Sequence, residues 1–176
     1  EIAGKEGKSN EQVWASDGLA AWATSASTDG TRAAISVNGA LYTVRGRSIY
    51  SYDAAGNETR IAGIASDAPV TMARNRRPSP QIGIVSQDGQ YVVIDGGVAS
   101  DYSSILRGGA NSICSVAGYF VFTHSDGSVS HTQEDNATSV DLLAYGLAES
   151  SADPAIRGLP KQGEVVAFGT KSIDFF

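Results

Sequence analysis

The only two histidines, His124 and His131, lie on either side of an Asp126–Gly127 turn, and they are the first candidates for metal chemistry. A hairpin at this turn would place the two imidazoles on neighbouring strands, with Glu134–Asp135 a few residues further on. A zinc site needs three or four ligands in a fixed geometry, and no third ligand has a suitable spacing. We therefore predict that both histidines are exposed hairpin residues and that the chain binds no metal.

Other catalytic patterns are also incomplete. Gly7-Lys8-Ser9 matches the end of a phosphate-binding loop, but Ile2 stands where that loop needs a glycine. The single cysteine, Cys114, forms no plausible Cys–His pair and no internal disulfide, so we predict a small buried apolar residue. Nineteen Asp and Glu residues make chance carboxylate pairs certain, so such a pair does not indicate a glycosidase. The sequence predicts no catalytic residue and no cofactor, and hence a protein that is not an enzyme.

One basic cluster, Arg74–Pro78, could serve as a binding surface. The two prolines in residues 78–80 lack the backbone N–H that a strand ladder uses, so we expect a strand to end here. The guanidinium groups of the cluster form either a solvated loop rim or a surface that meets a phosphate or an acidic neighbouring subunit. We hypothesise that Arg76 and Arg77 lie at a subunit contact, with Arg74 beside them.

Charge is unevenly distributed along the chain. Residues 1–77 hold nine Lys or Arg against eight Asp or Glu, whereas residues 78–176 hold four against eleven, which gives net charges of +1 and −7. An acidic half argues against tight sequence-independent DNA binding, which depends on neutralising phosphates. Hydrophobic residues are 41% and charged residues 18% of the chain, values that argue against disorder and against a coiled coil. No apolar run is long enough for a transmembrane helix.

Alternating apolar residues, rather than helical spacing, dominate the chain, and Val, Ile, Tyr, Phe and Thr are frequent among them. Asp-Gly occurs five times, and Asn38–Gly39 is a sixth dipeptide suited to a two-residue hairpin turn. Residues 140–145 suit either a strand or a helical turn, and residues 146–154 indicate a loop. We predict an all-β antiparallel protein whose strands include 41–44, 48–52, 82–85, 91–94, 113–116, 119–123, 164–168 and 172–176.

A recurring segment of strand, glycine and strand indicates a repeat. Its glycines lie 50, 29 and 45 residues apart and are Gly39, Gly89, Gly118 and Gly163. Blades of a β-propeller have four strands in about 40–50 residues, so the pattern predicts a β-propeller with about three blades plus part of another. A sandwich of about ten strands is the alternative. The blades would occupy residues 30–176, after a weakly defined N-terminal segment of residues 1–29.

Five segments also carry a family resemblance. They are Asn38–Val44 with Gly46–Tyr50, Val70–Arg74, Gly118–Gly127, Ala148–Pro154 and Gly163–Phe176. The last is the most specific, because it is similar to a Phe-Gly-Ser-Ser-Thr-Ile-Glu-Tyr-Phe strand pair. In this order the segments resemble the packaged DNA stabilisation proteins of lambdoid short-tailed bacteriophages (podoviruses), over residues 30–176.

The resemblance implies a structural virion protein, a tail hub and head-completion factor that plugs the portal channel and stabilises packaged DNA. It implies a six-bladed propeller, of which this chain would be about half, in a homo-oligomeric ring that is expected to be a hexamer. The expected partners are a portal-side adaptor and a distal tail needle or fibre, without sequence-specific nucleic-acid binding and without a membrane. The expected location is the tail or neck of the virion, after synthesis in the cytoplasm of a bacterial host or from a prophage.

Two other functions fit the same fold. A carbohydrate-binding or glycoside-hydrolysing β-propeller would bring carboxylates, arginines and aromatic rings together in a central pocket. The Asp-box of sialidases has one residue between its Asp and its Gly, and Ser27–Thr31 and Ser86–Gly89 have none. A generic propeller that acts as an interaction scaffold would share the fold and differ only in its partners.

Overall fold

Strands form almost all of the regular structure in this protein. The computed structural model describes residues 20–147 and 153–176, and these contain fifteen β-strands and one short 3-10 helix, η1 (Ser103–Ile105). The strands form four antiparallel sheets, and in each sheet consecutive strands are neighbours. The all-β antiparallel prediction is therefore confirmed.

Each sheet is one blade. Blade A consists of β1 (Thr31–Val37), β2 (Ala40–Arg45), β3 (Ser48–Tyr52) and β4 (Glu58–Gly63). Blade B consists of β5 (Val70–Arg74), β6 (Ile82–Ser86), β7 (Tyr91–Asp95) and β8 (Val98–Asp101). Blade C consists of β9 (Ala110–Val116), β10 (Tyr119–His124), β11 (Ser128–Gln133) and β12 (Asn136–Leu147). Blade D consists of β13 (Ala155–Lys161), β14 (Glu164–Gly169) and β15 (Ile173–Phe175).

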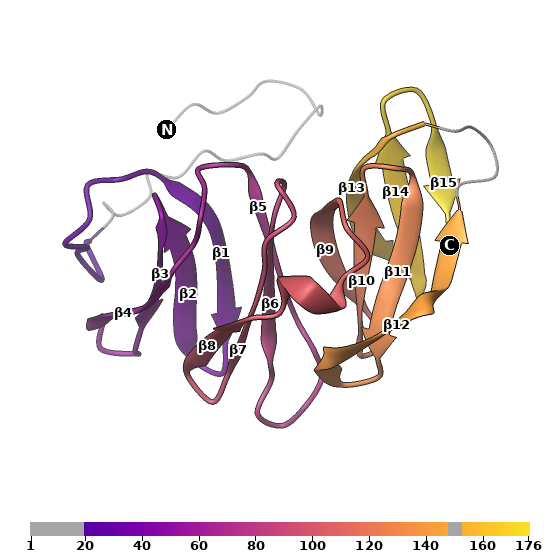
Figure 1. Cartoon of the computed structure of the whole chain (residues 1–176). Helices are drawn as coiled ribbons and strands as arrows, with labels where there is room; N and C mark the ends of the chain where they lie inside the picture. Colours follow the sequence, from indigo (N-terminus) through magenta and orange to yellow (C-terminus); the bar gives the residue numbers. More distant parts are fainter. Residues whose placement is uncertain (1–19, 148–152) are drawn as a thin grey trace, which may run out of the picture.

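The blades follow one another side by side, from the indigo strands to the yellow ones in Figure 1. Their first strands are in contact in series, β1 with β5, β5 with β9, and β9 with β13. The first strand of each blade is thus the inner one, and the later strands lie further out. This is the arrangement of a β-propeller, here with three four-stranded blades and three strands of a fourth in the part of the chain that the structure describes.

The blade repeat is more regular than the glycine spacing predicted. The first strands β1, β5, β9 and β13 begin 39, 40 and 45 residues apart. Gly39, Gly118 and Gly163 join the first and second strands of blades A, C and D, and each has a positive φ. Gly89, by contrast, lies between the second and third strands of blade B. The uneven spacing arose because Gly89 marks a different turn of its blade.

Most of the turn predictions are confirmed. Asn38, Ala117 and Gln162 have positive φ angles, as do the glycines that follow them, which is the backbone of a two-residue hairpin turn. Three of the Asp-Gly dipeptides connect consecutive strands, namely Asp88–Gly89, Asp95–Gly96 and Asp126–Gly127. Asp29–Gly30 precedes β1 and forms no hairpin, and Asp17–Gly18 lies outside the described residues.

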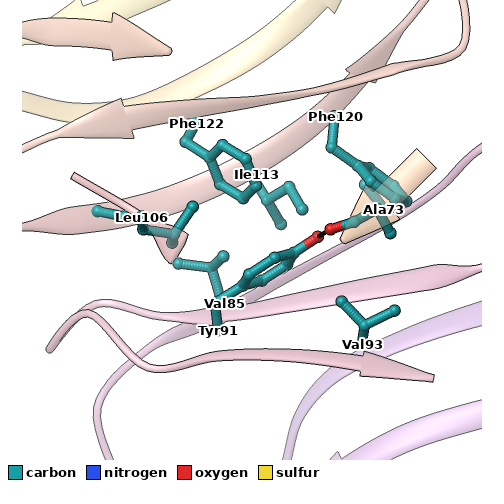
Figure 2. Close-up of a cluster of buried hydrophobic side chains, with 10 residues drawn as sticks. Ala73, Val85, Tyr91, Val93, Leu106, Ile113, Phe120 and Phe122 are labelled. Atoms are coloured by element: carbon teal, nitrogen blue, oxygen red, sulfur yellow. Dashed lines mark hydrogen bonds between the residues drawn. The ribbon is translucent and has the colours of Figure 1, made fainter. Parts of the chain in front are cut away.

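Apolar side chains fill the space between neighbouring blades. The interface of blades B and C, shown in Figure 2, is built around the ring of Tyr91, which meets the ring of Phe122 edge-on at 4.9 Å between centroids. The Tyr91 hydroxyl donates a hydrogen bond of 2.8 Å to the Ala137 carbonyl on the outermost strand of blade C. Between blades C and D lies Cys114, a free buried thiol as predicted, and burial raises its pKa to about 11.

The ambiguous segment 140–145 is part of β12, and not a helical turn. Gly146 and Leu147 also belong to this strand, so the predicted loop is wrong for these two residues, and residues 148–152 lie outside the described residues. The pairing of β12 with β11 is interrupted, because Ser130 pairs with Tyr145 while Thr132 pairs with Val140. The residues in between form a bulge on which Leu143 is 87% exposed.

Candidate functional site

The predicted basic cluster lies at the hairpin that joins β5 to β6. Strand β5 ends at Arg74, as the two prolines predicted, and residues 75–81 form a longer loop where blades A, C and D have a two-residue turn. Arg74 is exposed, and within the described ranges no acidic side chain pairs with it. Blade B is therefore the one blade of the four whose first hairpin projects a charged loop.

Two buried amides close this loop at its base. Asn75 and Gln81 are almost fully buried, although both are polar. The Asn75 N–H donates to the Gln81 carbonyl at 3.2 Å, and the Gln81 N–H donates to the Asn75 side-chain oxygen at 2.8 Å. The Asn75 side-chain amide donates to Gln81 Oε1 at 2.9 Å. These bonds satisfy the backbone N–H groups of Asn75 and Gln81 at the base of the loop without a regular turn.

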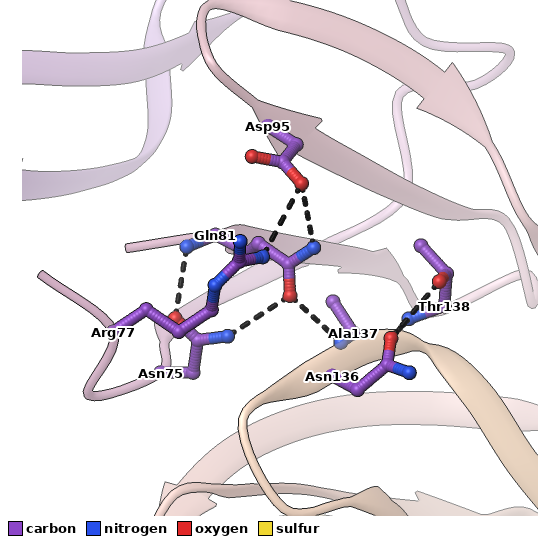
Figure 3. Close-up of polar contacts among 7 residues, drawn as sticks. All are labelled: Asn75, Arg77, Gln81, Asp95, Asn136, Ala137 and Thr138. Atoms are coloured by element: carbon purple, nitrogen blue, oxygen red, sulfur yellow. Dashed lines mark hydrogen bonds and ion pairs between the residues drawn. The ribbon is translucent and has the colours of Figure 1, made fainter. Parts of the chain in front are cut away.

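The Gln81 side chain also joins blade B to blade C (Figure 3). Its Oε1 accepts a second hydrogen bond, of 2.9 Å, from the N–H of Ala137 on β12. Its Nε2 donates to the Asp95 carboxylate at 2.7 Å. The Gln81 side chain thus holds the basic loop in place relative to the end of β7 and to blade C.

Arg76 and Arg77 have acidic partners within the chain. The backbone N–H of Arg76 donates to Asp135 Oδ1 at 2.9 Å. The Arg76 guanidinium donates to the Ala117 carbonyl and lies 3.2 Å from the Glu134 carboxylate. Arg77 lies 3.4 Å from Asp95. These pairs are exposed and contribute little to stability individually, on the order of 0–1 kcal/mol. The subunit contact of Arg76 and Arg77 stays a prediction, and Arg74 is the cluster member that has no acidic partner within the described residues.

The prediction for the two histidines is half wrong. His131 is exposed, but His124 is fully buried at the end of β10. Its Nε2 lies 2.7 Å from Ser130 Oγ, and its Nδ1 lies 3.3 Å from the Gly108 carbonyl, in the connection from blade B to blade C. Burial lowers the pKa of His124, against weaker opposing effects that include the charge of Asp126. The residue is a buried structural histidine that ties two strands to the connection between the blades.

This burial predicts a pH-dependent stability. Because the folded pKa of His124 is lower than its ordinary value of 6.5, the unfolded chain binds the proton more readily below that pH. Stability should therefore be full above about pH 6.5 and fall as the pH decreases, by up to about 1.4 kcal/mol per pH unit. Chemical denaturation between about pH 7.5 and pH 5 would measure this loss. The loss of stability between these pH values should be smaller in a His124→Gln variant and unchanged in the matched His131→Gln variant. The same dependence of stability on pH in the unsubstituted protein and in both variants would contradict the assignment.

Two shallow hollows lie on the surface of the part of the chain that the structure describes. The first, of about 330 Å³, lies between the ends of β12 and β15 and is lined by Leu147, Asp174 and Phe175 among others. The second, of about 290 Å³, lies on blade A beside Trp22 and Tyr52. Neither hollow is lined by two carboxylates, the arrangement that a glycosidase requires. Within residues 20–147 and 153–176 no three His, Cys, Asp or Glu side chains are grouped as metal ligands, and no helix has the length and apolarity to span a membrane.

Comparison with known protein families identifies this propeller. The model of the family described as "Bacteriophage P22 Gp10, beta-propeller" matches residues 2–176. The chain belongs to this family. The match begins well before residue 30, so it includes the N-terminal segment in which no motif was recognised. No curated protein matches the chain in sequence.

Solved structures agree with the fold of this Gp10-family chain. Virginiamycin B lyase from Staphylococcus aureus is 12% identical, with a TM-score of 0.64 over 86% of this chain and 56% of the lyase. BamB from Moraxella catarrhalis is 12% identical, with a TM-score of 0.59 over 81% of this chain and 42% of BamB. The computationally designed Ika4 protein is 11% identical, with a TM-score of 0.63 over 85% of this chain and 92% of Ika4. The chain thus spans about half the length of the two natural proteins.

Proposed function

We propose that this protein is a structural component of a phage tail or neck that closes the portal channel and holds packaged DNA in the head. The observation that carries the proposal is the family match over residues 2–176. A protein of this kind acts by contacts with its neighbours and not by chemistry, so we propose that it is not an enzyme. Its place would be the virion of a short-tailed phage, as a tail hub.

The charge distribution supports this proposal. The −7 net charge of residues 78–176 would repel a DNA backbone. A channel component that closes behind the genome and later lets it leave benefits from a surface that does not bind DNA tightly. The proposed partners are accordingly proteins, namely a portal-side adaptor and a distal tail needle or fibre, together with further copies of this chain in a ring, with a hexamer as the expected form.

The basic loop is the proposed subunit contact. Arg76 and Arg77 position the loop through Glu134 and Asp95, and Arg74 stays exposed beside them. A ring needs a heterologous interface in which one surface of a subunit meets a different surface of the next. The cationic loop of one subunit and the acidic half of its neighbour would form such a pair, since opposite charges steer association and determine its register.

The mass of the native assembly tests the proposal. We expect the protein to form a closed ring, and to bind a phage portal complex when the portal is added. An Arg74→Glu variant should weaken ring assembly by about tenfold or more, because it places like charges together, whereas Lys171→Glu, the same charge change at an exposed position on blade D, should not. Native mass spectrometry would give both results. A monomer that binds no portal complex would contradict the proposed function.

A further inference from the structure

The outer rim of blade C carries a row of apolar side chains. Leu143, Tyr145 and Leu147 are 87%, 43% and 57% exposed, and they lie two residues apart on β12, the outermost strand of this blade. Ala144 and Gly146 between them are partly buried, so the exposed side chains share one side of the strand. Outermost strands usually carry charged residues, because an apolar edge invites association with another chain. The row is therefore a candidate interaction surface.

This row lies on the side of β12 that faces blade B. Tyr145 pairs with Ser130, which in turn pairs with Phe122, a residue of the interface with blade B. The connection from blade B places the Arg107 guanidinium 4.0 Å from the centre of the Tyr145 ring. Blade D packs on the opposite side of blade C. The row thus stays exposed with both adjoining blades in place, and packing of blade on blade does not cover it.

One end of the row is acidic. Asp141 is exposed two residues before Leu143, and its Oδ1 accepts the Leu143 N–H at 2.9 Å. No basic side chain pairs with Asp141 within the described ranges. Both residues belong to the bulge of β12, which interrupts the regular ladder that an added strand requires. The surface of Asp141, Leu143 and Tyr145, called the rim patch below, therefore suits a loop that docks through its side chains.

The basic loop of blade B has the complementary composition. Arg74 is an exposed cation without an acidic partner in the described residues, and Pro78 is exposed beyond it. The loop extends past the neighbouring strand ends at the lower edge of Figure 1. It is also held in place, because the Asn38 side-chain amide donates to the Pro78 carbonyl at 3.2 Å. A loop that is already ordered loses little conformational entropy when it binds.

We propose that residues 74–81 of one copy of this chain dock on the rim patch of the next copy. Arg74 pairs with Asp141, and the ring of Pro78 packs on the apolar side chains beside that carboxylate. The inference rests on the proposed ring and names the second surface of its heterologous contact. An apolar centre with a charge pair at its edge is the usual composition of a protein interface, and the charge pair determines the register.

An exchange of charges tests the contact on the full 176-residue chain. Sedimentation velocity over a range of concentrations gives the Kd of assembly. Arg74→Glu and Asp141→Lys should each raise this Kd about tenfold or more, because each places like charges together. A chain with both substitutions should assemble within about threefold of the unsubstituted protein, since the pair is restored with its charges exchanged. Asp141→Asn keeps the acceptor for the Leu143 N–H, removes only the charge, and should weaken assembly about threefold.

A second pair of variants tests the apolar part of the rim patch. Leu143→Ser should weaken assembly about tenfold, because it removes an apolar side chain from the centre of the contact. Leu142→Ser is the matched control, since Leu142 is also exposed but points to the other side of β12, and it should leave the Kd unchanged. Thermal melts of every variant establish that it is folded.

The outcomes separate this contact from the proposed function. Recovery in the doubly substituted chain, together with weaker assembly of Leu143→Ser alone, would support the contact. A ring without that recovery, or with equal assembly of the two leucine variants, would overturn the contact and leave the proposed function standing. A chain that stays monomeric at about 100 μM would also overturn the contact. Binding of the same samples to a phage portal complex then decides the proposed function separately.

Discussion

Replacing Phe122 with alanine is expected to lower the free energy of unfolding by about 3–5 kcal/mol. The side chain is fully buried between blades B and C, and its ring packs edge-on against Tyr91. Truncation would remove the buried ring and leave a cavity among side chains contributed by both blades, which can relax only partly. The loss is a large fraction of the stability of an ordinary domain, so this variant should be near the limit of folding.

Equilibrium unfolding in urea measures this effect, with the midpoint and the m-value fitted together. Phe175→Ala is the matched control, because Phe175 is 59% exposed on blade D, and it should change stability by less than about 0.5 kcal/mol. Similar losses in the two variants would contradict the assignment of the B–C interface as a principal source of stability. A reduced m-value in Phe122→Ala, with a small shift of the midpoint, would indicate instead that the blades unfold separately.

The strands could be predicted because local chemistry specifies them. Runs of apolar and β-branched residues define the strands, some of which, such as β6, are buried on both faces, and Asn38–Gly39 favours the positive φ angles of its turn. The blade spacing predicted from the glycines was uneven because Gly89 does not lie at the first turn of its blade, and this has a physical reason. Blade B replaces the usual two-residue turn with the loop 75–81, which contains no glycine, so the first turn glycine of this blade is Gly89, between β6 and β7.

The contacts of the basic loop could not be predicted from its own residues. Arg76 meets Asp135 and Glu134, which are almost sixty positions away in the sequence, and only the packing of blade B on blade C brings them together. His124 was misassigned for a related reason. The turn beside it predicts exposure, but the connection between the blades covers its ring. Local patterns thus define the blades, whereas burial of polar residues depends on how the blades pack.

Packing between the blades combines apolar and polar contacts, and their roles differ. Apolar side chains supply most of the free energy, and they tolerate small sliding movements of one sheet on another. A hydrogen bond that a specific backbone N–H donates to a buried side chain is more selective, since it forms in one register only. Gln81 makes such a bond to Ala137, and it does so from the loop that carries the basic cluster.

Replacing Gln81 with leucine should therefore cost about 3 kcal/mol of stability, although the volume of the side chain changes little. The substitution leaves the Asn75 amide and the Ala137 N–H buried without an acceptor, and each unpaired group costs about 1–3 kcal/mol. Gln133→Leu is the control, because Gln133 is exposed on β11, and it should be nearly neutral. Amide hydrogen exchange should show earlier opening of Ala137 in the Gln81 variant alone. Equal stability of the two variants would mean that the apolar core by itself aligns blades B and C.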